Sequence, residues 1–147
     1  MPRTRRVAAE KPAQDDDALR RAAAAISILV VDDDDLVRSG VVRSLARLNY
    51  RVLSVASPAE ALALLRSDNQ RVDLLLTDIR MPGAMDGIEL ARVVRREFPR
   101  IAILLTTGFA GWEATAGDER ILYKPYRLAE LAAAVRESLA AASRRSA

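Results

Sequence analysis

The chain has 147 residues, half of them apolar, and a formal net charge of +3 at pH 7. This composition fits one globular domain, and a body so close to neutral argues against a nucleic-acid-binding surface, which needs clustered positive charge. The absence of Cys and His excludes disulfides, Cys/His zinc sites and any mechanism that requires an imidazole or a thiolate of this chain.

The first residues lack the periodicity of a folded element. Residues 1–25 mix Pro, Ala, Arg and Asp, so we expect a flexible tail with a few helical turns at Asp17 to Ala25. No apolar run approaches the ~18 residues of a membrane span. The run Ala22 to Val31 lies between acidic stretches and has no small-residue cleavage site. We therefore expect a cytoplasmic protein without membrane contact.

A regular alternation of strand and helix patterns begins at residue 26. Ile26 to Val31 is a continuous apolar run rich in β-branched residues, which is typical of a central parallel strand. Apolar residues at helical spacing then predict a helix over Leu36 to Leu48, and Arg51 to Val55 follows as a second strand. The Ser-Pro-Ala-Glu run at residues 57–60 indicates a helix start with a capping box.

The middle of the chain continues the alternation. Val72 to Thr77 is a third strand that leads to Asp78, and the Pro- and Gly-rich stretch from Ile79 to Gly87 is a loop. Ile88 to Phe98 is a helix, which Pro99 stops.

The last part of the domain contains its least regular segment. Ile101 to Thr106 is a fourth strand, and Gly108 to Glu119 leaves room only for a short or irregular fourth helix. Ile121 to Tyr123 is a fifth strand, and Leu128 to Ala142 is a final helix. The alternation predicts an α/β domain over residues 26–142, with a five-stranded parallel sheet and helices on both faces, followed by a short tail at 143–147.

The residues with chemical potential follow the strands of this predicted sheet. Because the carboxyl ends of parallel strands meet at one edge, we expect Asp32, Asp33 and Asp78 to converge there. Three carboxylates close together repel one another unless a cation neutralises them, and Mg²⁺ is the usual cellular choice. Acidic residues can also cap the helix that follows; we assign that role to Asp35, and it stays open for Asp34.

Thr107 and Lys124 end the fourth and fifth strands and should face the same edge. A hydroxyl and an ammonium opposite a metal-bound carboxylate make a pocket for a phosphoryl group, and a carboxylate can accept that group as an acyl phosphate. Each residue taken alone also has a simpler interpretation, in which Thr107 bonds to the backbone and Lys124 is a solvated turn residue.

Five short motifs together resemble the receiver domain of two-component response regulators of the chemotaxis-regulator type. They are ILVVDDD at 28–34, LLLTDIRMPG at 74–83, MDGIEL at 85–90, LLTTG at 104–108 and LYKP at 122–125. The resemblance covers about residues 26–142. It implies a flavodoxin-like sheet with the strand order 2-1-3-4-5.

The resemblance also implies a role for each matching residue. Asp78 would be the phosphoacceptor, Asp33 a direct Mg²⁺ ligand, Asp32 a ligand through water, and the main-chain carbonyl of Arg80 the third protein ligand. The remaining assignments are Thr107 as the switch hydroxyl, Gly108 as the small residue that admits the phosphate, Lys124 as its cationic partner, and a cis peptide before Pro125.

Three features depart from the family pattern. The loop MPGAMDG is one residue longer than the commoner form, as in receivers that stand alone or belong to hybrid sensor kinases. The position that often carries an aromatic switch residue is Ile121, and the aromatic residue is Tyr123 instead. The segment from Gly108 to Arg120 is short for a receiver.

The expected function is that of a single-domain response regulator, which receives a phosphoryl group on Asp78 from a phosphohistidine of a sensor histidine kinase or a histidine phosphotransfer protein. We expect no enzyme activity beyond self-catalysed phosphotransfer and autodephosphorylation. The tails leave no room for an effector domain, so the output would be contact with an unidentified downstream protein, by a monomer or a weak homodimer.

Two other functions are consistent with parts of the sequence. A receiver-like binding module that works without phosphorylation would explain the irregular segment after Gly108. A metal-dependent phosphatase with an aspartyl nucleophile would use Asp32 to Asp34, but the Gly-Thr pair and the cap-sized insertion of those enzymes are missing.

Overall fold

The computed structural model describes residues 16–67 and 69–146, and its centre is a five-stranded parallel sheet in the order β2-β1-β3-β4-β5. The strands are β1 (Ser27–Val31), β2 (Arg51–Val55), β3 (Leu74–Asp78), β4 (Ala102–Thr107) and β5 (Arg120–Tyr123). β1 and β4 are buried along their whole length, which explains the apolar runs at residues 28–31 and 102–105. The predicted α/β class and strand order are confirmed.

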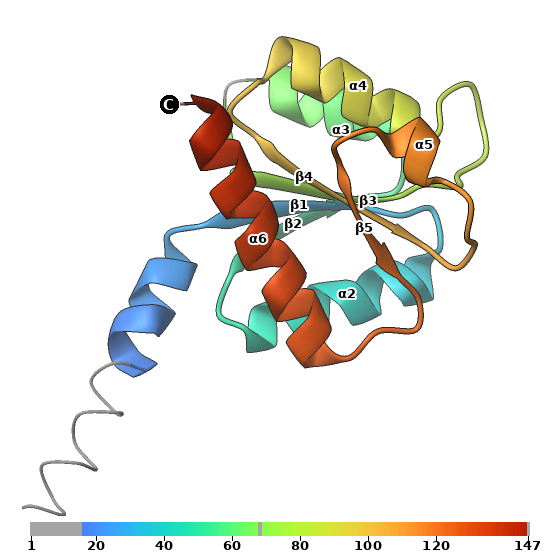
Figure 1. Cartoon of the computed structure of the whole chain (residues 1–147). Coiled ribbons are helices and arrows are strands. Elements are labelled where there is room, and N and C mark those ends of the chain that lie inside the picture. Colours follow the sequence, from blue (N-terminus) through green and yellow to red (C-terminus); the bar gives the residue numbers. More distant parts are fainter. Residues whose placement is uncertain (1–15, 68, 147) are drawn as a thin grey trace, which may run out of the picture.

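Helices cover both faces of the sheet (Figure 1). They are α2 (Asp35–Arg47), α3 (Pro58–Arg66), α4 (Gly87–Glu97), α5 (Glu113–Ala116) and α6 (Leu128–Ser146). Alternate strand residues face opposite layers: Ile28 and Val30 pack with α2 and α6, whereas Leu29 and Val31 pack with α3 and α4. The sheet is therefore enclosed by two apolar cores, and its carboxyl edge is where polar side chains collect.

Helix α2 is capped by Asp34, for which the role was left open, and not by Asp35 as predicted. The carboxylate of Asp34 accepts hydrogen bonds from the backbone N–H groups of Leu36 and Val37, at 2.9 and 3.0 Å. Asp35 is already the first helical residue and forms an ion pair with Arg38. The capping assignment to Asp35 was wrong because the cap is the residue with extended backbone just before the first turn.

Capping of α3 also differs in detail from the prediction. Ser57 caps α3 by accepting from the Glu60 N–H, but the Glu60 carboxylate bonds to the Ser57 hydroxyl rather than to its backbone. A complete capping box occurs instead at α4, between Asp86 and Glu89. The box at α4 fixes where the loop after β3 ends.

The ends of the domain extend further than the sequence suggested. α6 continues through Ser146, beyond the predicted end at Ala142, because nothing in this stretch breaks a helix and Arg144 and Arg145 favour its C-terminal dipole. Residues 16–24 are helical, where a few turns were predicted, and this helix lies apart from the sheet (Figure 1). Most of the flexible tail predicted for residues 1–25 lies outside the described residues.

The predicted short fourth helix is confirmed as α5, which has four residues. It begins after Trp112 without a side-chain cap and ends at Gly117, whose φ of 66° is left-handed. Within the described part of the chain, no helix is long and apolar enough to span a bilayer.

Candidate functional site

Three carboxylates meet at the carboxyl edge of the sheet, as predicted. Asp32 follows β1 and is buried, Asp33 beside it is exposed, and Asp78 is the last residue of β3. β1 and β3 are paired so that Val31 lies opposite Thr77, and one oxygen from each of the three carboxylates lies within 4.8 Å of the others. The cluster has the donor type and spacing that suit a hard divalent cation.

Lys124 reaches into this cluster from the end of β5. Its Nζ atom lies 3.6 Å from Asp78 Oδ1 and 3.8 Å from Asp32 Oδ2. The backbone N–H of Lys124 donates to the carbonyl of Thr107, so its position is fixed by β4, and the Lys124–Pro125 peptide is cis as expected. The interpretation of Lys124 as a solvated turn residue is therefore wrong.

The carboxylates are only partly neutralised by the protein. Burial raises the pKa of Asp78, Lys124 lowers it by a smaller effect, and the neighbouring Asp32 raises it further. Burial likewise raises the pKa of Asp32, against the backbone N–H of Asp34 and the charge of Lys124. One ammonium does not offset three carboxylates, so the donor set fits a bound cation.

Arg38 supports this edge and was not identified from the sequence. Its Nη1 donates to the main-chain carbonyl of Asp32 at 2.8 Å, and its Nη2 donates to Asp35 at 2.6 Å. The backbone N–H of Asp34 holds the Asp32 carboxylate from the other side, at 2.9 Å. These contacts fix the turn that carries Asp32 and Asp33. Hydrophobic periodicity in the sequence does not show which partner an arginine on a helix contacts, so this role of Arg38 could not be predicted.

Thr107 ends β4 with its side chain almost completely buried. Its Oγ1 accepts a hydrogen bond from the Phe109 N–H at 3.2 Å, so in this state the hydroxyl holds the loop that follows. A Cβ at Gly108 would meet no heavy atom within 4 Å, so local packing does not require glycine there. Its assignment as the residue that admits phosphate stays a prediction.

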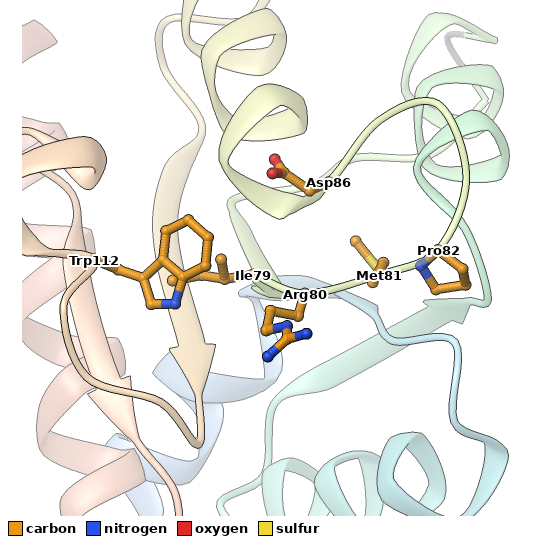
Figure 2. Close-up of a pocket in the computed structure, with 6 residues that line it drawn as sticks. All are labelled: Ile79, Arg80, Met81, Pro82, Asp86 and Trp112. Atoms are coloured by element: carbon orange, nitrogen blue, oxygen red, sulfur yellow. The ribbon is translucent and has the colours of Figure 1, made fainter.

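The loops after β3 and β4 meet above the cluster. Cζ of Arg80 lies 4.6 Å from the centroid of the exposed Phe109 ring, a cation–π contact. Beside it is a cavity of about 460 Å³, lined by Ile79, Arg80, Met81, Pro82, Asp86 and Trp112. Figure 2 shows Asp86 where the loop after Asp78 joins α4, and Trp112 beside Ile79, in the segment that leads into α5.

The positions around the expected aromatic switch are occupied differently from the family pattern. Ile121 is half-buried and packs on the core between the sheet and α4, as does Trp112. Tyr123 is exposed to 37% of its surface. The aromatic side chain that packs on the core from the irregular segment is therefore that of Trp112, and residue 121 contributes only aliphatic packing.

Gly87 is a second supporting residue without an assigned role in the sequence. A Cβ at this position would lie 2.0 Å from the carbonyl oxygen of Asp78, and the Gly87 N–H donates to the Ile79 carbonyl at 2.8 Å. The start of α4 thus packs directly against the backbone of Asp78, with no room for a side chain at residue 87. In the sequence, this role is indicated only by the position of Gly87 directly after Asp86, the residue that caps α4.

A doubly covered parallel sheet with an acidic cluster and a lysine at its carboxyl edge defines the class of receiver domains. The chain belongs to the response regulator receiver domain family, whose sequence profile matches residues 28–136. This family is a signalling domain of two-component systems rather than a class of enzymes.

Relatives of two kinds share this domain. The chain is 36% identical over 111 residues to the response regulator receiver protein CpdR of Brucella abortus, covering 72% of this chain and 90% of CpdR. It is 37% identical over 109 residues to the sensor kinase CckA of the same organism, covering 70% of this chain but only 11% of the kinase. A receiver protein structure from Sinorhizobium medicae has a TM-score of 0.72 and 34% identity, over 80% of this chain and 96% of that one.

Proposed function

We propose that this receiver accepts a phosphoryl group on Asp78 from a phosphohistidine of a sensor histidine kinase or histidine phosphotransfer protein in the cytoplasm. The observation that carries the proposal is the convergence of Asp78, the acidic pair and Lys124 at one edge. Similarity to the receiver protein CpdR over 90% of its length and to part of the sensor kinase CckA supports it. Phosphorylation would then change contacts with a downstream protein, with the receiver as a monomer or weak homodimer.

The transfer would use the groups at this edge, the cation that they hold and the phosphodonor. A carboxylate oxygen of Asp78 attacks the phosphorus, the N–P bond of the phosphohistidine breaks, and the histidine nitrogen keeps the bonding electrons. Lys124 neutralises charge on the phosphoryl oxygens. Asp33, Asp78, Asp32 through water and the Arg80 carbonyl would hold Mg²⁺, which supplies further neutralisation of charge when bound.

The hydrogen bond of Thr107 suggests how the signal leaves the site. Its hydroxyl accepts from the Phe109 N–H in this state. If the Thr107 side chain rotates towards a phosphoryl group so that its hydroxyl donates there, Phe109 loses that acceptor and the loop after β4 must rearrange. Two-state coupling of this kind is typically worth about 1–3 kcal/mol.

Incubation with acetyl phosphate and Mg²⁺, followed by intact-mass measurement, tests the proposal. We expect one hydroxylamine-sensitive phosphoryl group on the wild type, none on Asp78→Asn, and normal labelling of the exposed control Asp118→Asn. An unlabelled wild type, or a labelled Asp78→Asn protein, would refute it.

The four-residue α5 and the aliphatic residue at position 121 favour one alternative, a receiver-like module that binds its partner without phosphorylation. Amide NMR spectra recorded with and without Mg²⁺ and beryllofluoride distinguish the two. Spectra that change at Thr107 and beyond support the phosphorylation switch, whereas unchanged spectra support the alternative.

A further inference from the structure

A group of arginines lies at the end of the molecule opposite Asp78. Arg95 is in the last turn of α4, Arg144 and Arg145 are in the last turn of α6, and Arg100 is in the turn before β4. The C-terminal ends of α4 and α6 lie close together in Figure 1, at the edge where β4 begins. We call these four residues the basic face.

Two adjoining cavities open at the basic face and share Arg145. The outer one, of about 380 Å³, is lined by Arg95, Pro99, Arg100 and Arg145, so no carboxylate borders it. The inner one, of about 210 Å³, lies between α6 and the start of β5 and includes Ser138, Arg144 and Glu119 in its lining. The outer cavity therefore suits an anion, and the inner one suits a polar group.

Most of the positive charge at this face is not used within the protein. Arg95 forms an ion pair with the largely buried Glu119, and Arg145 acts on Glu119 only as a weaker, more distant charge that lowers its pKa. Among the described residues, Arg100, Arg144 and Arg145 have no carboxylate within ion-pair distance. Three guanidinium groups thus remain available to a ligand.

Ser138 gives an independent indication that the inner cavity binds something. Its Oγ is the one buried side-chain polar atom in the described part of the chain that has no hydrogen-bond partner. A buried hydroxyl without a partner costs about 1–3 kcal/mol. Ser138 lines the inner cavity, and a change of its rotamer would bring this hydroxyl within reach of a ligand there.

We propose that the basic face binds an acidic segment of a partner protein. Carboxylates would pair with the guanidinium groups of Arg100 and Arg145 in the outer cavity, where the planar fork of arginine matches a carboxylate in two parallel hydrogen bonds. A neighbouring polar side chain of the same segment would bond to Ser138.

The surroundings favour a peptide over other polyanions. Asp118 and Glu137 also border the inner cavity and would repel a uniformly charged phosphodiester backbone or lipid surface, whereas a peptide can alternate charged and neutral side chains. Three free arginines in a compact area are also few for nucleic acid, which is bound through many phosphate contacts. Because this face and Asp78 lie at opposite ends of the sheet, a partner here does not compete with the phosphodonor.

Fluorescence anisotropy of a labelled peptide of alternating Glu and Ser, mixed with the full chain, tests this interaction. The double variant Arg100→Glu/Arg145→Glu should weaken binding on the order of tenfold, which corresponds to about 1.4 kcal/mol. The double variant Arg43→Glu/Arg47→Glu carries the same charge change on exposed positions of α2 and should bind within about twofold of the wild type. Equal weakening by both double variants would overturn the proposal.

Further measurements test the inner cavity and the choice of a peptide as the ligand. Ser138→Ala should weaken peptide binding and raise the melting temperature of the free protein, since it removes an unsatisfied hydroxyl; unchanged binding contradicts the role of the inner cavity. Single-stranded DNA or phosphatidylglycerol vesicles that bind as tightly, with the same dependence on Arg100, would overturn the choice of a peptide. If the double variant does not fold, Arg100→Glu alone should still weaken binding severalfold.

Labelling of Asp78 by acetyl phosphate serves as the internal control. The face variants should be labelled at the wild-type rate, because none of the substituted residues contacts the carboxyl edge. Loss of peptide binding with normal labelling supports the basic face, and loss of labelling alone counts only against the phosphorylation proposal.

Discussion

Replacing Gly87 by alanine should damage both the stability and the phosphorylation of this receiver. The added Cβ would lie 2.0 Å from the Asp78 carbonyl oxygen and 2.9 Å from the carbon of that carbonyl. Ordinary C–H···O contacts have a C···O distance of about 3.3–3.6 Å. The atoms in the way belong to the backbone, so no side-chain rotation can relieve the contact, and β3 and α4 must move apart.

The cost can be bounded from two opposing effects. Overpacking a tight site typically costs about 1–3 kcal/mol and occasionally more. Gly→Ala within a helix gains at most about 1 kcal/mol, and Gly87 is the first residue of α4, where the gain is smaller. A contact this short belongs at the upper end of the first range, so we expect a net loss of about 2 kcal/mol.

Gly40 offers a matched control within the same protein. It lies inside α2, and a Cβ there would meet only the end of the Arg43 side chain, at 3.9 Å. Gly40→Ala should therefore stabilise the protein by up to about 1 kcal/mol. The two substitutions make the same chemical change and should shift stability in opposite directions.

Urea unfolding followed by circular dichroism, together with the rate of labelling by acetyl phosphate, provides the measurement. We expect Gly87→Ala to lower the unfolding midpoint and slow labelling, because moving the Asp78 backbone moves its carboxylate relative to Lys124. A Gly87→Ala protein with the stability and labelling rate of the wild type would show that the close approach has no energetic consequence.

Three further outcomes can be checked with single substitutions. Burial raises the pKa of Asp78 above its ordinary value of 3.8. The folded protein therefore keeps this carboxyl protonated to a higher pH than the unfolded chain does, and ionising it at neutral pH destabilises the fold. Asp78→Asn should thus raise the melting temperature of the metal-free protein at neutral pH, with a gain that shrinks as pH falls towards 3.8; a gain independent of pH would contradict this. The Arg80 side chain, two residues after Asp78, is held against Phe109, where we expect it to limit the access of water to an aspartyl phosphate. Arg80→Ala removes that contact, worth about 0.5–1 kcal/mol, and should speed dephosphorylation about two- to fivefold; an unchanged decay rate would reject this shielding. Ser57→Ala removes the cap on the Glu60 N–H and should cost about 1 kcal/mol in urea unfolding, with no effect on labelling if the site is independent of α3.

The strands and their order could be predicted because burial leaves a readable pattern. Strands buried on both faces, such as β1 and β4, carry runs of at least four apolar residues, and connections through helices favour a parallel sheet. Helix starts leave a weaker signal. Asp34 and Asp35 differ by one position, and only backbone geometry decides which of them caps α2.

The sequence by itself determined which residues stand at the functional edge. Asp78 ends a strand and Asp32, Asp33 and Lys124 directly follow one, and in a parallel sheet all such positions fall on the same side. Their identity and convergence therefore follow from residue type and topology together, without any knowledge of loop paths.

Only the tertiary structure decided which residues support that edge and what lies elsewhere on the surface. Three contacts are of this kind: the hydrogen bond from Arg38 to the Asp32 carbonyl, the close packing of Gly87 on Asp78, and the grouping of arginines near Ser138. Each involves residues that are far apart in the chain or that follow no hydrophobic periodicity. Hydrophobic periodicity records which side of each element is buried. It does not record how two elements approach or which rotamer a long side chain adopts, and those two factors create these contacts.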